Sequence, residues 1–112
     1  MTTNAYSVTT VTTSASGNTV VITPGAGHRL RLFYVLMNAD GANVADVTAA
    51  LRFGAAGDLI YTVCLKAGSI FGRNIGAAGL RHHVRGAINE PLYINLSAAQ
   101  TVNATVEWEE SV

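Results

Sequence analysis

Apolar and polar side chains alternate strictly along two runs near the end of the chain, residues 92–96 and 102–108. The side chains that share the apolar face of these runs are Leu92, Ile94, Leu96, Val102, Ala104, Val106 and Trp108. Because successive side chains of a β-strand leave opposite faces of its sheet, this period of two predicts strands with one buried face. We expect the two runs to form a closing hairpin whose apolar face lies in the core. Glu107 and Glu109 are then expected on the solvent face.

Similar short runs occur along the whole chain, separated by turns rich in glycine, asparagine and proline. They lie at residues 7–16, 19–23, 28–38, 44–53 and 59–65. A helix competes for residues 44–50, which are rich in alanine, although valine and threonine weaken it. Residues 69–75 are expected to be irregular, and residues 80–86 to form a loop or a weak sheet edge. The spacing predicts an all-β fold: an antiparallel β-sandwich or jelly roll of about eight strands, with no significant helix.

The first run differs from the others in composition. Residues 7–16 contain many threonines and few large apolar side chains, so they have little to bury. Branching at Cβ restricts χ1 and favours extended backbone. We predict that residues 1–17 form an edge strand or an extended N-terminal arm, paired as a hairpin with residues 19–23. The whole chain, residues 1–112, is expected to be a single domain.

Charged residues make up 12% of the chain, against about 25% in an ordinary soluble domain. Apolar residues make up 49%, and the formal net charge is zero. So few charges predict that another protein covers part of the surface, either a second copy or a larger partner. A surface made simply of alanine and glycine is the alternative. No basic patch indicates nucleic acid or an anionic membrane, and no apolar run approaches the roughly 20 residues that cross a bilayer.

The residue types that carry catalysis do not occur in a catalytic arrangement. Cys64, the one cysteine, lies within an apolar run and is predicted to be a buried, unreactive thiol. Glu107 and Glu109 share a strand face without a third, orienting group. His82 and His83 are adjacent in an expected loop, where solvated histidines are the main interpretation and a metal or pH-sensing site the alternative. We predict a protein that is not an enzyme and that holds no cofactor and no metal.

Several of these strand patterns resemble a known family. They are Gly-His-Arg-Leu-Arg-Leu at residues 27–32, Arg-Phe-Gly at 52–54, Glu-Pro-Leu-Tyr-Ile-Asn-Leu-Ser-Ala-Ala at 90–99, and the final Val-x-Ala-x-Val-x-Trp strand. Over these segments the chain is similar to the jelly-roll capsid decoration proteins of tailed phages. The resemblance implies a homotrimer that binds the major capsid protein on the outer face of a phage head and stabilises that head.

The same resemblance implies a place on the capsid exterior, after synthesis in the host cytoplasm. Residues 1–6 lack the basic and apolar regions of a signal peptide, which agrees with synthesis and retention in the cytosol. Two alternatives stay open. One is a carbohydrate- or protein-binding module of a phage fibre or tail, and the other is a head-completion or tail component.

The expected partner surface has three parts. The threonine-rich first segment can pair its backbone with a neighbouring chain. Residues 33–37 are apolar on both faces of a strand, which predicts a second layer over them. Residues 73–85 collect basic side chains, and arginine is enriched at interfaces. The residues assigned to this surface are Val8, Val11, Phe33, Val35, Met37, Arg73, Arg81, His82, His83 and Arg85.

Overall fold

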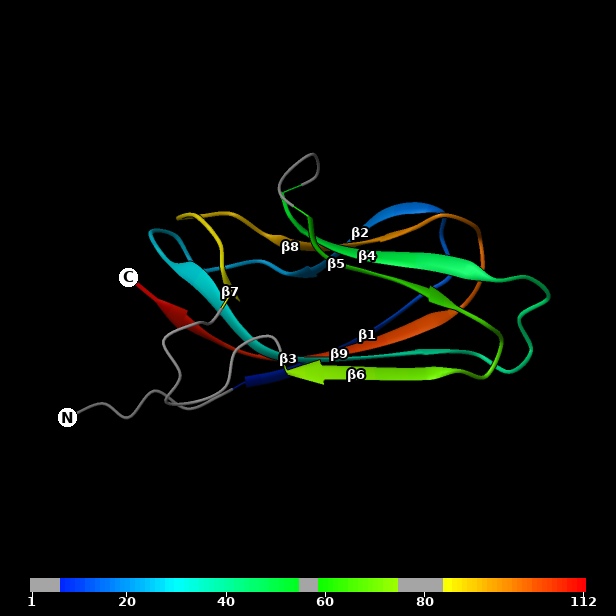
Figure 1. Ribbon diagram of the computed structural model, residues 1–112. Coiled ribbons are helices and arrows are strands. Elements are labelled where there is room, and N and C mark those ends of the chain that lie inside the picture. The colour runs from blue at the N-terminus through cyan, green and yellow to red at the C-terminus, as the bar shows by residue number, and fades with distance from the viewer. Residues whose placement is uncertain (1–6, 55–58, 75–83) are drawn as a thin grey trace.

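Two antiparallel β-sheets pack face to face in the computed structural model, which describes residues 7–54, 59–74 and 84–112 (Figure 1). Sheet I has the strand order β1-β9-β3-β6, and β7 also pairs with β3. Its strands are β1 (Ser7–Thr13), β3 (Arg29–Ala39), β6 (Ile70–Asn74), β7 (Val84–Arg85) and β9 (Val102–Ser111). Sheet II has the order β2-β8-β4-β5. Its strands are β2 (Gly17–Ile22), β4 (Val47–Phe53), β5 (Leu59–Leu65) and β8 (Leu92–Leu96).

This strand order is that of a jelly roll, a double-sheet sandwich built from two Greek keys. The chain changes sheet at every connection except β4–β5 and β6–β7. Strands β6 and β7 pair with successive parts of β3, so together they occupy one strand position. The described residues form nine strands, one of them only two residues long, and no helix. The predicted all-β sandwich of about eight strands is therefore confirmed.

The predicted closing hairpin is wrong, because β8 and β9 lie in different sheets. The chain crosses the sandwich at residues 97–101, and Ser97 is fastened to sheet II there. Its N–H donates to the carbonyl of Thr48 (3.0 Å), and its Oγ accepts from the N–H of Thr48 (2.9 Å). The apolar faces of β8 and β9 thus meet the same core from opposite sides. Alternation indicates which face of a strand is buried, but it does not indicate the neighbouring strand.

The hairpin predicted between the first two runs is also wrong. Strand β1 pairs with β9, and β2 pairs with β8. Gly17 has a φ of 93°, a backbone conformation that glycine adopts without steric cost. The hydroxyl oxygens of Thr13 and Thr19 lie 2.9 Å apart, so they join the two sheets at this side of the sandwich. Strand β1 is an edge strand of sheet I, while residues 1–6 lie outside the described residues.

Large apolar side chains from both sheets form the core between them, as the period of two predicted. Those that are fully buried are Leu30, Leu32, Val35, Met37, Val47, Leu51, Leu65, Leu92, Ile94, Leu96, Val102 and Val106. Trp108 is only partly buried and packs against this core. Its Nε1–H donates to Oγ1 of Thr9 on the adjacent edge strand (2.9 Å), which satisfies the indole while its ring stays largely covered.

The strand expected at residues 44–53 forms from Val47 onward, and the competing helix at residues 44–50 does not form. The segment expected to be irregular forms β6 along the edge of β3. Glycine lowers strand propensity, but at Gly72 it leaves room for a side chain of the neighbouring strand. A Cβ at Gly72 would collide with the hydroxyl of Tyr34, whose side chain crosses over it from β3.

Candidate interaction surfaces

A bulge interrupts the apolar stretch at residues 33–37. The register of β3 against β9 shifts between Leu32 and Tyr34, and such a bulge changes which face each following residue occupies. Leu32 is buried before the shift, and Val35 and Met37 are fully buried after it. Val35 and Met37 therefore contact the core of their own sandwich. Of the surface predicted on this strand, Phe33 remains partly exposed.

On β1 the two predicted valines lie on opposite faces. Val8 is 62% exposed and shares the outer face with Thr10. Val11 is partly buried and packs against the core. The hydroxyl of Thr10 lies 3.0 Å from that of Thr105 on β9, so cross-strand hydroxyl pairs cover this part of the outer face. Val8 is the one predicted residue of β1 that points outward.

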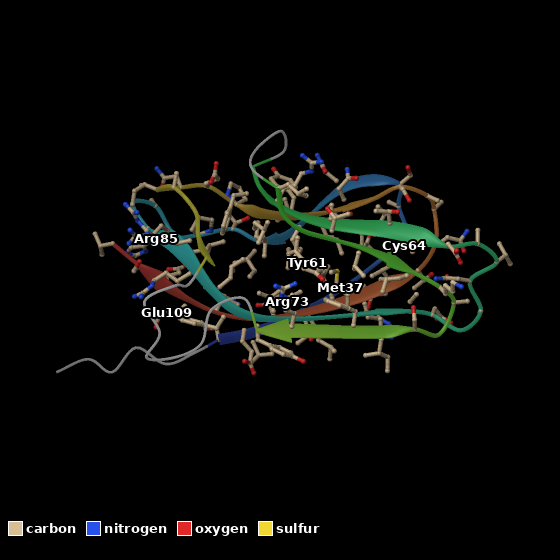
Figure 2. All side chains as sticks on the ribbon, in the orientation of Figure 1. Met37, Tyr61, Cys64, Arg73, Arg85 and Glu109 are labelled. Atoms are coloured by element: carbon tan, nitrogen blue, oxygen red, sulfur yellow. The ribbon has the colours of Figure 1, made fainter. Side chains whose placement is uncertain are left out.

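Arg73 lies at the edge where the two sheets come together, beside β5 (Figure 2). Its guanidinium carbon is 5.1 Å from the ring centroid of Tyr61, within the range of a cation–π contact. The ring of Tyr61 stacks in turn on Phe71 of β6, with 5.1 Å between centroids and 19° between planes. The three side chains therefore join β5 of sheet II to β6 of sheet I. Sequence reasoning missed Tyr61 and Phe71, because it did not indicate that these two edges are neighbours.

Arg85 of β7 belongs to a row of charged side chains across sheet I. It pairs in register with Arg31, which pairs in register with Glu109 of β9. Arg31 Nη1 lies 2.9 Å from Glu109 Oε1. The predicted exposure of Glu109 is wrong: only 8% of the residue is exposed, and the ion pair with Arg31 neutralises the carboxylate there. The other basic-loop residues of the predicted surface, Arg81, His82 and His83, lie outside the described residues.

A second ion pair fastens the end of β9. His28 Nδ1 lies 3.2 Å from Glu110 Oε2, and the N–H of Gly25 donates to Oε1 of the same carboxylate (3.1 Å). The N–H of His28 also donates to the carbonyl of Gly25 (2.9 Å). These contacts connect the turn before β3 to the last strand. These contacts stabilise the fold at this end of sheet I.

Cys64 is exposed, and its predicted burial is wrong. It lies on β5 between Val63, which packs against the core, and Leu65, which is buried. Because neighbouring side chains of a strand point to opposite faces, the thiol of Cys64 points away from the core. Strand β5 is an edge of sheet II, so a neighbouring molecule can reach this thiol.

Within residues 7–54, 59–74 and 84–112, no group of three metal-binding side chains comes together. The same residues contain no helix that could span a membrane. What the described surface offers is instead two open sheet faces and four sheet edges, with exposed apolar side chains. Outside the turns and the chain end, the largest of these are Val8, Val20, Leu59 and Ile70.

No protein-family profile and no curated protein matches the chain. A solved structure does match it: a chain from the work described as "Bacillus endospore appendages form a novel family of disulfide-linked pili". The similarity covers 99% of this chain and 91% of that chain, with a TM-score of 0.52 and 12% sequence identity. At this identity the match shows a shared fold, and it agrees with the β-sandwich seen in this chain.

This match overturns the resemblance to phage capsid decoration proteins. The expectations that depended on that resemblance are wrong with it: the trimer on a phage head, the major capsid protein as partner, and the place on the virion exterior. The alternatives, a binding module of a phage fibre or tail or a tail component, agree better with the finding than the capsid interpretation does. The prediction that the chain is not an enzyme agrees with a fold shared with a structural subunit.

Proposed function

We propose that this chain is a structural, non-enzymatic subunit that binds copies of itself to form an extracellular, appendage-like fibre. The observation that carries the proposal is the match to a chain from disulfide-linked pili over 99% of this sequence. In the proposed fibre, the jelly roll described above is the building unit.

The surface supports self-association in two ways. Strands β1, β2 and β5 are edge strands, whose outward backbone N–H and C=O groups can pair with another strand. Charged residues, the usual protection of such surfaces, make up only 12% of the chain. Val8 on β1, Val20 on β2 and Leu59 on β5 are more than two-fifths exposed on these same edge strands, and burying them against a second copy is favourable.

The proposed fibre differs from disulfide-linked pili in how its subunits can be joined. Cys64 is the one cysteine among the 112 residues. A chain with one thiol can form one disulfide, so it can link two copies but cannot link a continuous series. Disulfides within these 112 residues therefore cannot by themselves propagate a fibre.

The proposal is tested by concentrating the purified protein under reducing conditions and examining it by negative-stain electron microscopy and by sedimentation. Fibres that form above a critical concentration, and that dissolve to folded subunits on dilution, are the expected result. A monodisperse monomer by light scattering at every concentration reached would refute the proposal. Glycan-array binding by such a monomer would instead support a carbohydrate-binding module.

A further inference from the structure

The outer face of sheet II carries one row of side chains that crosses all four strands. The registers place Val20 of β2 beside Tyr93 of β8, Tyr93 beside Arg52 of β4, and Arg52 beside Leu59 of β5. Val20 and Leu59 are 44% and 54% exposed. Arg52 is the only charged residue on the strands of this sheet, and it has no ion pair within the part of the chain that the structure describes. The row thus offers a single cation between exposed apolar groups.

The outer face of sheet I carries a matching row of opposite charge. Glu107 of β9 lies between Val8 of β1 and Tyr34 of β3. Glu107 is exposed. The other two acids of β9 are engaged, Glu109 with Arg31 and Glu110 with His28, whereas Glu107 has no such partner in the described ranges. This row therefore offers a single anion between an exposed valine and a tyrosine.

The two rows cross their sheets in the same order of strand positions, although they lie at different positions along the strands. Strands β1 and β2 lie on the same side of the sandwich, since the hydroxyls of Thr13 and Thr19 meet there, so both valines stand on that side. From there each row continues inward across the same succession of strand positions. The side chain of Tyr34 lies across Gly72 on the neighbouring strand β6.

We propose that sheet II of one copy stacks on sheet I of the next, with Arg52 close to Glu107 of the neighbouring copy. This inference rests on the proposed function and specifies the contact that propagates the fibre. Moving one copy onto the next without turning it, with a shift along the strands, places β2 over β1, β8 over β9 and β4 over β3. The strand of Arg52 then faces that of Tyr34 across the roughly 10 Å between stacked sheets, one strand spacing (about 4.8 Å) to the side of the strand of Glu107. The long side chain of Arg52 can extend across this gap toward the carboxylate of Glu107 and the ring of Tyr34.

The occupant of each face is a second copy in the same orientation, because the charges disfavour symmetrical contacts centred on either row. Two copies that met through sheet II would bring Arg52 against Arg52, and two that met through sheet I would bring Glu107 against Glu107. Like charges in one interface cost several kcal/mol. A contact between two different faces is heterologous, and it repeats without end when the rotation between copies does not close a ring.

Charge reversal tests this contact. R52E and E107R each place like charges in the interface, and each is expected to raise the critical concentration for assembly by about tenfold or more. K66E and D46R are the matched controls, since they change the net charge equally at exposed turn residues outside both rows, and they are expected to assemble like the wild type. Circular dichroism and urea unfolding establish that every variant is folded.

Mixing the two single variants gives the decisive measurement. Sheet II of R52E carries an anion that matches the cation on sheet I of E107R, and the reverse contact keeps the original pair. The mixture is therefore expected to form fibres in which the variants alternate, although neither variant assembles alone, and the double variant R52E/E107R is expected to assemble by itself. If either single variant forms fibres at the same critical concentration as the wild type, the proposed contact is wrong and the proposed function still stands. Folded single variants that stay apart when mixed would also overturn it. A wild type that never polymerises would overturn both.

Discussion

Gly86 occupies a position with no room for a side chain, and this gives a direct test of the packing. It follows β7, is buried, and its N–H donates to the carbonyl of Leu30 (3.0 Å). A Cβ at Gly86 would lie 2.8 Å from Cδ1 and 2.9 Å from Cε1 of Phe53. The ring of Phe53 is itself in the core, 4% exposed, so it cannot move aside without displacing its neighbours.

Gly86→Ala is therefore expected to destabilise the protein. Forcing a methyl group into a filled core costs about 1–3 kcal/mol. The loss of backbone freedom in the unfolded chain offsets about 0.4–1 kcal/mol of that cost, which leaves a net loss of about 1–2 kcal/mol in the free energy of unfolding. Urea denaturation followed by circular dichroism, under conditions in which the protein is monomeric, measures this difference as a lower midpoint at an unchanged slope.

Gly41→Ala is the matched control, because no heavy atom lies within 4 Å of the Cβ that it would add. Its unfolding midpoint is expected to stay the same or to rise. The double variant G86A/F53L, in which a smaller side chain faces the new methyl group, is expected to lose less stability than the sum of the two single changes. A midpoint for G86A equal to that of the wild type would show that Phe53 does not press against this backbone, and the reasoning would be refuted.

Three further predictions concern the core, the ion pair and the thiol. Leu51→Ala removes a fully buried side chain and is expected to lower the free energy of unfolding by about 2–5 kcal/mol, measured by urea denaturation. Glu109→Gln leaves Arg31 without its carboxylate partner and is expected to lower the free energy of unfolding by about 1–2 kcal/mol at neutral pH, since the pair is largely covered. A variant with the same free energy of unfolding as the wild type would contradict this. Cys64 is expected to react with a thiol reagent in the folded protein, to give dimers and nothing larger on non-reducing gels, and to be replaceable by serine without loss of fibres.

The burial of individual side chains could be predicted wherever it depends on the local backbone. Leu92, Ile94 and Leu96 alternate with polar residues and are all buried, since a strand turns every second side chain to the same face. The same alternation predicts that Cys64 points outward, because Val63 and Leu65 on either side of it face the core. The wrong expectation there followed the apolar character of the run and not its period.

What depends on strand neighbours could not be predicted in the same way. The bulge near Phe33 changes which residues of β3 face the core, and it depends on the register with β9. The clusters around Tyr61 and Arg52 likewise form only because particular strands are adjacent. The resemblance to capsid decoration proteins failed for a related reason. Strand patterns such as residues 92–96 report the jelly roll, and one fold serves many unrelated functions.

The pairing of β1 with β9 has a consequence for how the subunit is made. Ser7 lies opposite Trp108, so the first described strand finds its partner only after the last strand has been synthesised. Until then β3 also lacks β9, the strand that pairs with it along one edge from Arg29 to Ala39. Contacts between such distant parts of a chain form slowly, and the subunit is expected to reach its native state only after translation. The outer surface of sheet I is then completed in one late step, which would keep growing chains on the ribosome from joining a fibre before they are whole.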